Sequence, residues 1–326
     1  MMKNSKITMK DIAELCDVTK TTISRYFNGG YVKKETKDRI SKVIKKYNYD
    51  PNAFARLKAR QSYMIGIITP AIDSVSASRL LTGLEKVFRE KKYIPIIINT
   101  NYDTKLELVY LEKLKRLNVD GIVLNATEVS DEHRKMIRKL KIPVVVYGQQ
   151  FPDGVSVIND DYNAGREIGE YIGKKNYKYV GYITEKDSDI EVNRKNGIAD
   201  GLKKYNVKKV NFENADFSYD SAKRAANKLL LNKKINIIIC SSDKHAHAVY
   251  RVIMDKGLKI PDDISVISFG VYDVDDVIEP KLSTIKFDYL NAGVRTANVL
   301  LELINNNKSD KIHYIDYEFI EGESVK

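Results

Sequence analysis

Several features of membrane, secreted and catalytic proteins are missing from this sequence of 326 residues. No apolar run approaches the ~20 residues that a bilayer-spanning helix needs. The opening segment, "MMKNSKITMKD", carries charge but lacks the apolar core of a secretory signal. Only two cysteines are present, Cys16 and Cys240, which are too few for a disulfide framework. We therefore expect a cytoplasmic protein that makes no contact with a membrane.

Signatures of common enzyme classes are also missing. The sequence contains no GxGxxG, GxxxxGK[ST], GxSxG or HExxH pattern. His245 and His247 are two positions apart, which on a helix places them on different faces and disfavours a metal pair. We therefore expect no enzymatic activity, no catalytic residues, no bound metal and no cofactor.

Positive charge is concentrated at one end of the chain. The net charge is +11, and residues 1–62 contain 15 Lys and Arg against 6 Asp and Glu, whereas the remainder contains 40 against 38. A basic segment joined to a nearly neutral body is typical of proteins that bind the phosphate backbone of nucleic acids. A solvated basic tail would have the same charge, so the residue pattern must decide.

The basic segment has the pattern of two short helices joined by a tight turn. Thr8 and Asp11 resemble a capping box at the start of the first helix. Thr19 predicts the cap of a second helix that runs to Phe27. The turn is so short that we expect Asp17 to adopt a positive φ, where glycine is the usual choice. This arrangement predicts a helix-turn-helix motif, although any amphipathic helical pair could imitate it.

The second predicted helix has one apolar and one polar face. Ile23 and Phe27 point to the core. The opposite face carries Lys20, Thr21, Ser24 and Arg25. These side chains have donors of the right reach for base edges and phosphates in a major groove. Apolar residues at positions i, i+3, i+4 and i+7 of the segment 40–47 predict a third helix that closes the core.

The next segment, "YNYDPNAFARLKARQS" at 47–62, is basic and short. It is too charged to form a stable helix by itself. It can be read as a basic interdomain linker. It can also be read as a hinge that becomes helical on DNA and inserts an apolar side chain into the minor groove.

From Met64 onward, short β-branched runs alternate with amphipathic segments of helix length. About ten strands of this kind, apolar throughout, predict parallel sheets covered by helices on both faces. Two α/β lobes fit this length better than one open sheet. Polar residues follow the predicted strands, where such folds bind ligands, and they suit a polyhydroxylated molecule. A strand-end Asp is, however, equally often a helix cap.

Motifs along the whole chain resemble those of the lactose-repressor/galactose-repressor (LacI/GalR) family of bacterial transcription regulators. The head and hinge resemble the family in "MKDIAELCDVTKTTISRYFNGGYVKKETKDRI" and "YDPNAFARLKA". The body does so in "DGIVLNA", "IPVVVYG", "VINDDYNAG", "CSSDKHAHAV", "IPDDISVISFG" and "PKLSTIKFD". The trehalose- and sucrose-repressor-like branch is the most similar.

This resemblance implies a small all-α helix-turn-helix DNA-binding domain and an α/β two-lobed body like the type I periplasmic binding proteins. The DNA-binding domain would span 1–48 and the hinge helix or linker 49–62. The effector-binding and dimerisation domain would span 63–326, with a first lobe of 63–161 and 291–326 and a second of 162–290. A homodimer would bind a near-palindromic operator, and the final segment, "EFIEGESVK", has no leucine heptads for a larger assembly.

Individual site residues follow from the same resemblance. Lys20, Thr21 and Arg25 would read bases, and Thr19, Ser24 and Asn28 would contact phosphates. The hinge candidates are Asn52, Leu57 and Lys58. The effector candidates are Asp73, Ser78, Gln149, Asp160, Arg194 and Asp243, with the rings of Phe217 and Tyr289 stacking on the ligand.

Three positions depart from the family pattern. Asp17 stands where the turn usually has glycine. Lys58 stands where the hinge usually has its leucine, and Leu57 comes one residue early, so the wedging residue stays open. Gly270 replaces an acidic residue, so the ligand of the lactose repressor cannot be carried over.

The implied function is repression of a sugar-utilisation operon, with operator affinity controlled by a small sugar between the lobes. Sucrose or trehalose, with or without a phosphate, are the expected types, and Gln149 suits a hydroxyl better than a phosphate. Whether the sugar induces or co-represses stays open. A sugar-transport protein would require a signal peptide and no basic head, and a sugar or nucleotide enzyme would require a catalytic cluster.

Overall fold

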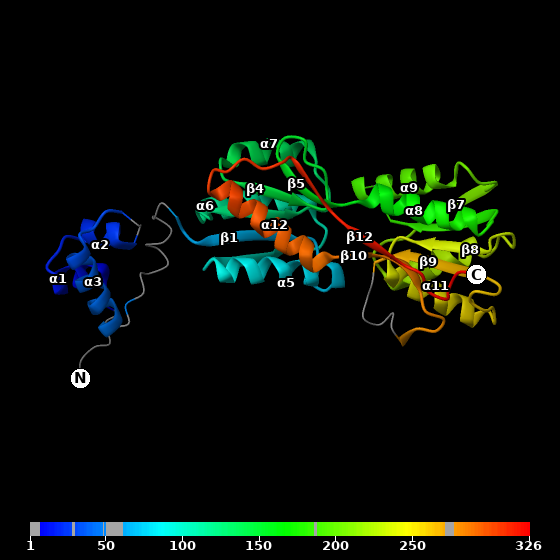
Figure 1. Cartoon of the computed structure of the whole chain (residues 1–326), viewed down its shortest axis with the longest axis horizontal. Helices are drawn as coiled ribbons and strands as arrows, with labels where there is room; N and C mark the ends of the chain where they lie inside the picture. The colour runs from blue at the N-terminus through cyan, green and yellow to red at the C-terminus, as the bar shows by residue number, and fades with distance from the viewer. Residues whose placement is uncertain (1–6, 28–29, 48, 50–60, 186–187, 271–276) are drawn as a thin grey trace.

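The computed structural model describes residues 7–27, 30–47, 49, 61–185, 188–270 and 277–326. Its ribbon consists of a small helical head and an α/β body with two lobes (Figure 1). The predicted fold class, an all-α head joined to a two-lobed α/β body, is therefore confirmed.

The head contains α1 (Met9–Leu15), α2 (Lys20–Phe27) and α3 (Lys34–Tyr47). The capping box is present, because the backbone N–H of Thr8 donates to Asp11 Oδ2 at 2.7 Å and that of Asp11 donates to Thr8 Oγ1 at 3.4 Å. Asp17 has a φ of +48°, as the short turn predicts. Local sequence thus accounts for the start of α1 and for the turn before α2.

The core of the head is small and closed by the residues just after α3. Its fully buried side chains are Ile12, Cys16, Ile23 and Ile40. Tyr47 does not close this core as expected, because it is 42 % exposed. The N–H of Tyr49 donates to Ile44 O at 3.0 Å, which turns the chain back and places the Tyr49 ring 6.1 Å from that of Phe27.

Each lobe of the body is built on one six-stranded sheet. The first sheet has the order β11 (Ile312–Ile315), β5 (Val155–Asn159), β4 (Val144–Tyr147), β3 (Gly121–Asn125), β1 (Met64–Thr69) and β2 (Ile94–Asn99). The second has the order β12 (Tyr317–Ile320), β10 (Ser283–Phe287), β9 (Ser265–Phe269), β8 (Ile237–Cys240), β6 (Tyr179–Thr184) and β7 (Lys209–Asn214). All neighbouring pairs are parallel except β10 and β12.

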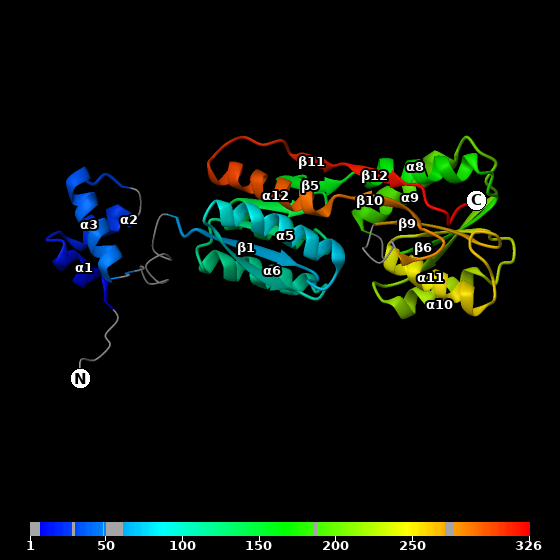
Figure 2. The ribbon, with the colours of Figure 1, turned by 60° about the horizontal axis from the view of Figure 1, so that its bottom comes forward.

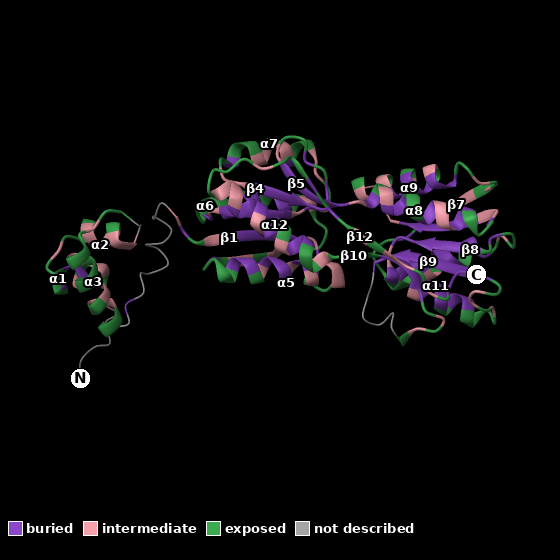
Figure 3. Cartoon of the chain, viewed as in Figure 1, coloured by how far each residue is buried: buried purple, intermediate pink, exposed green. Residues whose placement is uncertain are grey.

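Helices cover both faces of each sheet. The first sheet lies between α5 (Val75–Glu90) with α12 (Tyr289–Ile304) and α6 (Thr104–Arg116) with α7 (Asp131–Leu140). The second lies between α8 (Asp161–Lys174) with α9 (Asp189–Leu202) and α10 (Tyr219–Leu229) with α11 (Asp243–Asp255). The strands are accordingly buried and the outer helix faces exposed (Figure 3). This arrangement explains the apolar strand runs in the sequence.

Helices α5 and α12 lie side by side although they are about 200 positions apart in sequence (Figure 2). Their backbones touch at two glycines. A Cβ on Gly83 would lie 2.1 Å from Leu290 O, and one on Gly293 would lie 2.1 Å from Leu80 O. Only glycine permits this approach, which attaches the late helix α12 to the first lobe.

The expected lobe boundary at the end of the chain is wrong in one respect. Helix α12 and strand β11 pack in the first lobe. Strand β12 instead pairs antiparallel with β10 in the second sheet, with Tyr317 opposite Phe287. Beyond it, Ser324 Oγ donates to Val266 O and accepts from the N–H of Ser283. These backbone partners, which no local pattern reveals, fasten the final residues to the second lobe.

The chain crosses between the lobes three times, from β5 to α8, from β10 to α12 and from β11 to β12. All these strands lie at one edge of their sheets, the edge formed by β5 and β11 in the first lobe and by β10 and β12 in the second. Strands β2 and β7 form the opposite edges. The covalent hinge is therefore at one side of the body.

Candidate functional site

The polar face of α2 is open to solvent. Lys20, Thr21 and Arg25 are exposed, whereas Ile23 on the same helix is fully buried. The N–H of Thr22 donates to Thr19 Oγ1 at 3.2 Å, so Thr19 caps the helix. The apolar face of α2 is thus packed in the core of the head, while the side-chain hydrogen-bond donors of its polar face are exposed to solvent.

The start of α2 is suited to an anion. No acidic residue lies in its first turn, and Lys20 is its first residue. The free N–H groups at a helix N-terminus favour phosphate, and Lys20 adds a full positive charge. Ser24 is half-buried. The other predicted DNA contacts, Asn28, Asn52, Leu57 and Lys58, lie outside the described residues.

A clasp of hydrogen bonds fixes the chain where it enters the body. Asp120 accepts from the N–H and hydroxyl of Ser62 at 2.8 and 3.0 Å and from the N–H of Tyr63 at 2.8 Å. Gln61 Nε2 donates to the hydroxyl of Tyr93 at 2.6 Å. Asp120 comes directly before β3, so this clasp joins the segment leading from the head to the first sheet.

The second lobe holds a buried arginine. Arg194 on α9 is 7 % exposed, and its Nε donates to Asp161 Oδ1 at 2.8 Å. Its Nη1 donates to Ser241 O at 2.9 Å and lies 3.6 Å from Glu191 Oε1. The guanidinium also lies 4.3 Å from the centroid of the Phe269 ring. Two carboxylates therefore balance one cation in a site walled by aromatic rings.

Burial alters the titration of the groups around Arg194. It raises the pKa of Asp161 to about 6, although the charge of Arg194 opposes the shift. It raises the pKa of Glu185 to about 8, with a further contribution from Glu191 and an opposing one from Arg194. Burial works to lower the pKa of Arg194 itself, but Asp161 and Glu191 raise it overall. The arginine therefore stays charged while Glu185 can hold a proton at neutral pH.

Asp243, at the start of α11, is fully buried. It accepts hydrogen bonds from the hydroxyls of Ser268 and Thr284, the latter at 3.1 Å. A Cβ on Gly270 would lie 3.3 Å from Asp243 Oδ2, and the φ of +112° at this residue favours glycine. Gly270 is therefore required by the backbone, and the carboxylate near this position comes from Asp243.

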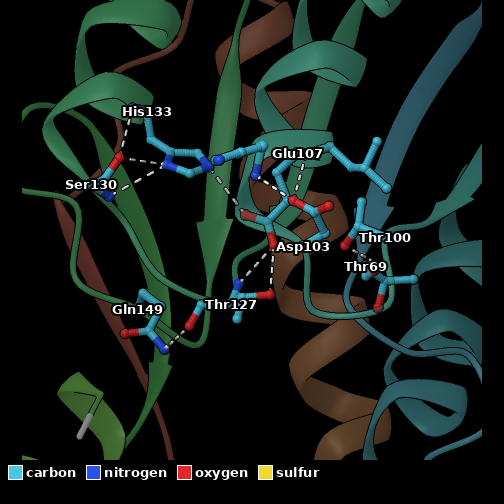
Figure 4. Close-up of polar contacts among 10 residues, drawn as sticks. Thr69, Thr100, Asp103, Glu107, Thr127, Ser130, His133 and Gln149 are labelled. Carbon is cyan, nitrogen blue, oxygen red and sulfur yellow. Dashed lines mark hydrogen bonds and ion pairs between the residues drawn. The ribbon is translucent and has the colours of Figure 1, made fainter. Parts of the chain in front are cut away.

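In the first lobe, Gln149 is connected to a buried polar network (Figure 4). Gln149 is 4 % exposed, and its Nε2 donates to Thr127 O at 3.4 Å. Glu107 Oε1 accepts from the N–H and hydroxyl of Thr127 at 3.1 and 2.6 Å. Glu107 Oε2 lies 3.2 Å from His133 Nε2, and both side chains are fully buried. His133 Nδ1 accepts from the N–H of Ser130, so the ring completes the cap of α7.

The remaining predicted effector residues are not gathered at one point. Asp160 caps α8 by accepting from the N–H and Nδ2 of Asn163, at 3.3 and 2.8 Å. Ser78 is exposed, and its hydroxyl donates to Val75 O. Tyr289 is half-buried and lies within electrostatic reach of Arg194. A ligand at Asp160 would have to compete with the helix cap.

Among the described residues, contacts between the lobes include a hydrogen bond and a pair of stacked rings. The N–H of Gln150 donates to Asp189 Oδ2 at 3.1 Å. The rings of Tyr102 and Phe217 stack with centroids 4.4 Å apart and planes inclined by 13°. Asp73 and Glu185, from opposite lobes, are the charged neighbours of the Tyr102 hydroxyl, whose pKa burial raises to about 12. The carboxylates of Asp73 and Glu185 and the rings of Tyr102 and Phe217 thus approach one another from the two lobes, and this region between the lobes is called the cleft.

Several residues of this region, including Asp161, Glu191 and Tyr102, were not among the predicted site residues. Asp161, and not the predicted Asp160, is the partner of Arg194. Glu191 precedes Arg194 by three positions, a helical spacing that could have revealed the pair. Tyr102 had no local signal, because its partner Phe217 is 115 positions away in the sequence.

No group of three or more His, Cys, Asp or Glu suited to a metal ion occurs among the described residues. None of the helices in the described ranges is both long and apolar enough to cross a membrane.

Comparison with known proteins matches the two parts of the chain to two family models. Residues 8–52 match "Bacterial regulatory proteins, lacI family", and residues 62–320 match "Periplasmic binding proteins and sugar binding domain of LacI family". The sucrose operon repressor of Staphylococcus xylosus is 30% identical over 321 residues, covering 97% of this chain and 98% of that protein. Catabolite control protein A of the same organism is 31% identical over 320 residues, covering 95% and 96%. The lac repressor dimer bound to operator and the anti-inducer ONPF has the same fold, with a TM-score of 0.84 at 18% identity over 98% of this chain and 99% of that one.

Proposed function

This chain belongs to the LacI family of bacterial regulatory proteins, and we propose that it represses a sugar-utilisation operon by binding a near-palindromic operator as a homodimer. It is a DNA-binding, sugar-responsive transcription regulator. The observation that carries the proposal is the exposed face of α2. This face presents Lys20, Thr21 and Arg25 to solvent, while Ile23 on the opposite face is buried in the core of the head. We place its action in the cytoplasm, where the operator DNA lies.

The DNA contacts divide by chemistry. Lys20, Thr21 and Arg25 read base edges, for which long or hydroxylated donors are suited. The phosphate contacts are Thr19, Ser24 and Asn28, and the hinge contacts are Asn52, Leu57 and Lys58. The first group sets sequence preference and the other groups set register and overall affinity.

The effector is an unphosphorylated disaccharide held between the lobes. The charge of Arg194 is already balanced by Asp161 and Glu191, so it has little attraction left for a phosphate dianion. Asp73 adds negative charge near Tyr102, whereas Glu185 is neutral while it holds its proton. Carboxylates suit sugar hydroxyls, and the rings of Phe217 and Tyr289 suit the apolar faces of a pyranose. The name of the sucrose operon repressor makes sucrose the first candidate.

Control of the operator follows from a shift between two lobe orientations. The sugar must bind one orientation better than the other to have any effect. Lobe movement passes to the head through the segment that the clasp of Asp120 attaches to the first sheet. An inducer stabilises the orientation whose paired heads fit the operator poorly.

Exposed apolar side chains support association into a homodimer. Ile72 before α5 and Leu290 in α12 are 51% and 45% exposed, and Met254 on α11 is 64% exposed. A subunit interface would cover such side chains, although single exposed apolar residues are also common on monomers.

The experiment is fluorescence anisotropy of labelled DNA from upstream of the protein's own gene and of neighbouring sugar genes. Sucrose, trehalose, maltose and their 6-phosphates are titrated into the complex. Release by an unphosphorylated disaccharide is the expected result. Tighter binding would make the sugar a co-repressor, release by a 6-phosphate would overturn the charge argument, and failure to bind any of these DNAs would overturn the proposal.

A further inference from the structure

Tyr102 and Phe217 form an aromatic contact between the lobes. Tyr102 follows β2 in the first lobe, and Phe217 follows β7 in the second. Their ring centroids are 4.4 Å apart and their planes are inclined by 13°, which is a parallel stack. The rings nevertheless stay 38% and 45% exposed, so the contact lies at the surface of the cleft and not in a closed core.

The backbone at Tyr102 is held in an unfavourable conformation. Tyr102 has a φ of +62° and Asn101 one of +51°. A bulky residue at positive φ is a genuine outlier, and such outliers gather where a side chain must be aimed at a functional contact. The N–H of Tyr102 donates to Pro70 O at 3.2 Å, and that of Asp103 donates to Thr100 O at 3.0 Å. These bonds fix the turn and thereby aim the ring.

The segment around Phe217 is fixed from the other lobe. The fully buried His245 uses Nε2 to bond Asp216 O at 2.9 Å, and its Nδ1 bonds the Ser241 hydroxyl at 3.0 Å. The N–H of Ser218 donates to Asp216 Oδ1 at 2.8 Å. Both rings are therefore mounted on rigid supports, and the stack can persist only at one relative position of the lobes.

The stack lies far from the crossings between the lobes, so a small rotation of the lobes moves the two rings a long way apart. The three covalent crossings lie at the edge formed by β5, β11, β10 and β12, whereas β2 and β7 are the opposite edge strands. With strands about 4.8 Å apart, the rings lie roughly 20 Å from the hinge edge. A rotation of roughly 10° about the hinge would separate the rings by about 3.5 Å, which is enough to break a parallel stack.

We propose that Tyr102 and Phe217 form a latch that holds the outer mouth of the cleft closed, which makes Tyr102 a further determinant of the response to the effector. The proposal rests on the function proposed above, because it treats the cleft between the lobes as the effector site. Stacked rings favour the latched orientation by about two- to tenfold. Loss of the latch changes the population of each lobe orientation, and the affinities for DNA and effector change with that population, by up to the same factor.

The first test measures the stack without DNA or sugar. The chain has no tryptophan, so Phe217→Trp introduces a single tryptophan, excited apart from the tyrosines, that can stack on Tyr102. Acrylamide quenching of this tryptophan should increase about twofold when Tyr102→Ala is added and stay unchanged with Tyr102→Phe. Tyr314→Ala, which removes an exposed ring from β11 of the same sheet, is the matched control. Equal quenching in all four proteins would overturn the latch.

The second test measures operator DNA affinity without sugar in Tyr102→Ala, Phe217→Ala and the double variant. The latch predicts the same change, of up to about tenfold, in all three, because the removal of either ring breaks the one contact. Multiplied effects in the double variant, or an unchanged affinity in every variant, would overturn it. A wild-type protein that binds none of the DNAs would contradict the proposed function alone, since the quenching test does not depend on it.

Discussion

Arg194 on α9 and Asp161, the first residue of α8, are joined by a hydrogen bond of 2.8 Å between two buried side chains. Asp161 lies directly after the crossing from β5, so this bond connects the centre of the second lobe to the hinge. A ligand that forms hydrogen bonds with Arg194 must weaken or rearrange the bond between Arg194 and Asp161, which lies at the crossing from β5 to α8. Under the proposed function, effector binding would act on the crossing between the lobes through this ion pair.

Replacement of Arg194 by alanine should abolish the effector response and spare operator binding, because the α2 face lies in a separate domain. It should also lower the stability of the body by about 3 kcal/mol, since Asp161 and Glu191 would be left buried without their cation. Anisotropy with and without sugar measures the first effect and thermal unfolding the second. A variant that still released its operator at the normal sugar concentration would remove Arg194 from the effector site.

Replacement of Arg25 by alanine should relax base discrimination at one operator position by about 1–3 kcal/mol, because a long donor would no longer read a base edge. Binding to a set of single-base operator variants measures this. Arg39→Ala, which removes an exposed arginine from α3, is the matched control and should leave discrimination intact. If Arg25→Ala weakened every DNA equally, Arg25 would be a phosphate contact.

Replacement of Glu107 by alanine should destabilise the first lobe by about 3 kcal/mol, because His133 and Thr127 lose their buried acceptor. Glu112→Ala on the same helix removes only an exposed ion pair with Arg116 and should cost about 0.5 kcal/mol or less. Thermal unfolding of the two variants compares them directly. Equal shifts in Tm would contradict a structural role for the buried network.

The raised pKa of Glu185 predicts a dependence of stability on pH. The folded carboxyl holds its proton up to about pH 8, whereas the unfolded one loses it near the ordinary value of 4.5. Between these values the folded state binds more protons, so stability should fall as the pH rises from about 5 to 8. Glu185→Gln should flatten this slope, and the surface variant Glu90→Gln should keep it. Tm values at pH 5, 6.5 and 8 measure the slopes, and identical slopes in all three proteins would refute the assignment.

Local patterns in the sequence were sufficient for the head and for the plan of the body. The capping residues Thr8 and Thr19, the positive φ of Asp17 and the buried apolar strands all follow from short-range chemistry. The edge strands β7 and β12 were not predicted, because they mix polar and apolar residues and resemble loops. Their place depends on partners far away in the sequence.

The contacts between the lobes and around Arg194 were predicted less well for a related reason. Asp160 and Asp161 are adjacent acids, and only the fold decides that the first caps a helix while the second binds Arg194. The contact of Tyr102 with Phe217 exists only because two lobes meet. The residue types could therefore identify candidate site residues, but only the folded structure shows which of them contact one another.

The strands β11 and β12, near the end of the sequence, also affect the order in which the domains can fold during synthesis. Residues 312–315 complete the first sheet and residues 317–320 complete the second, so neither sheet is finished until the last part of the chain has left the ribosome. The three helices of the head come from the first 47 residues and need none of this material. During synthesis, a DNA-binding head can therefore fold before the body that controls it.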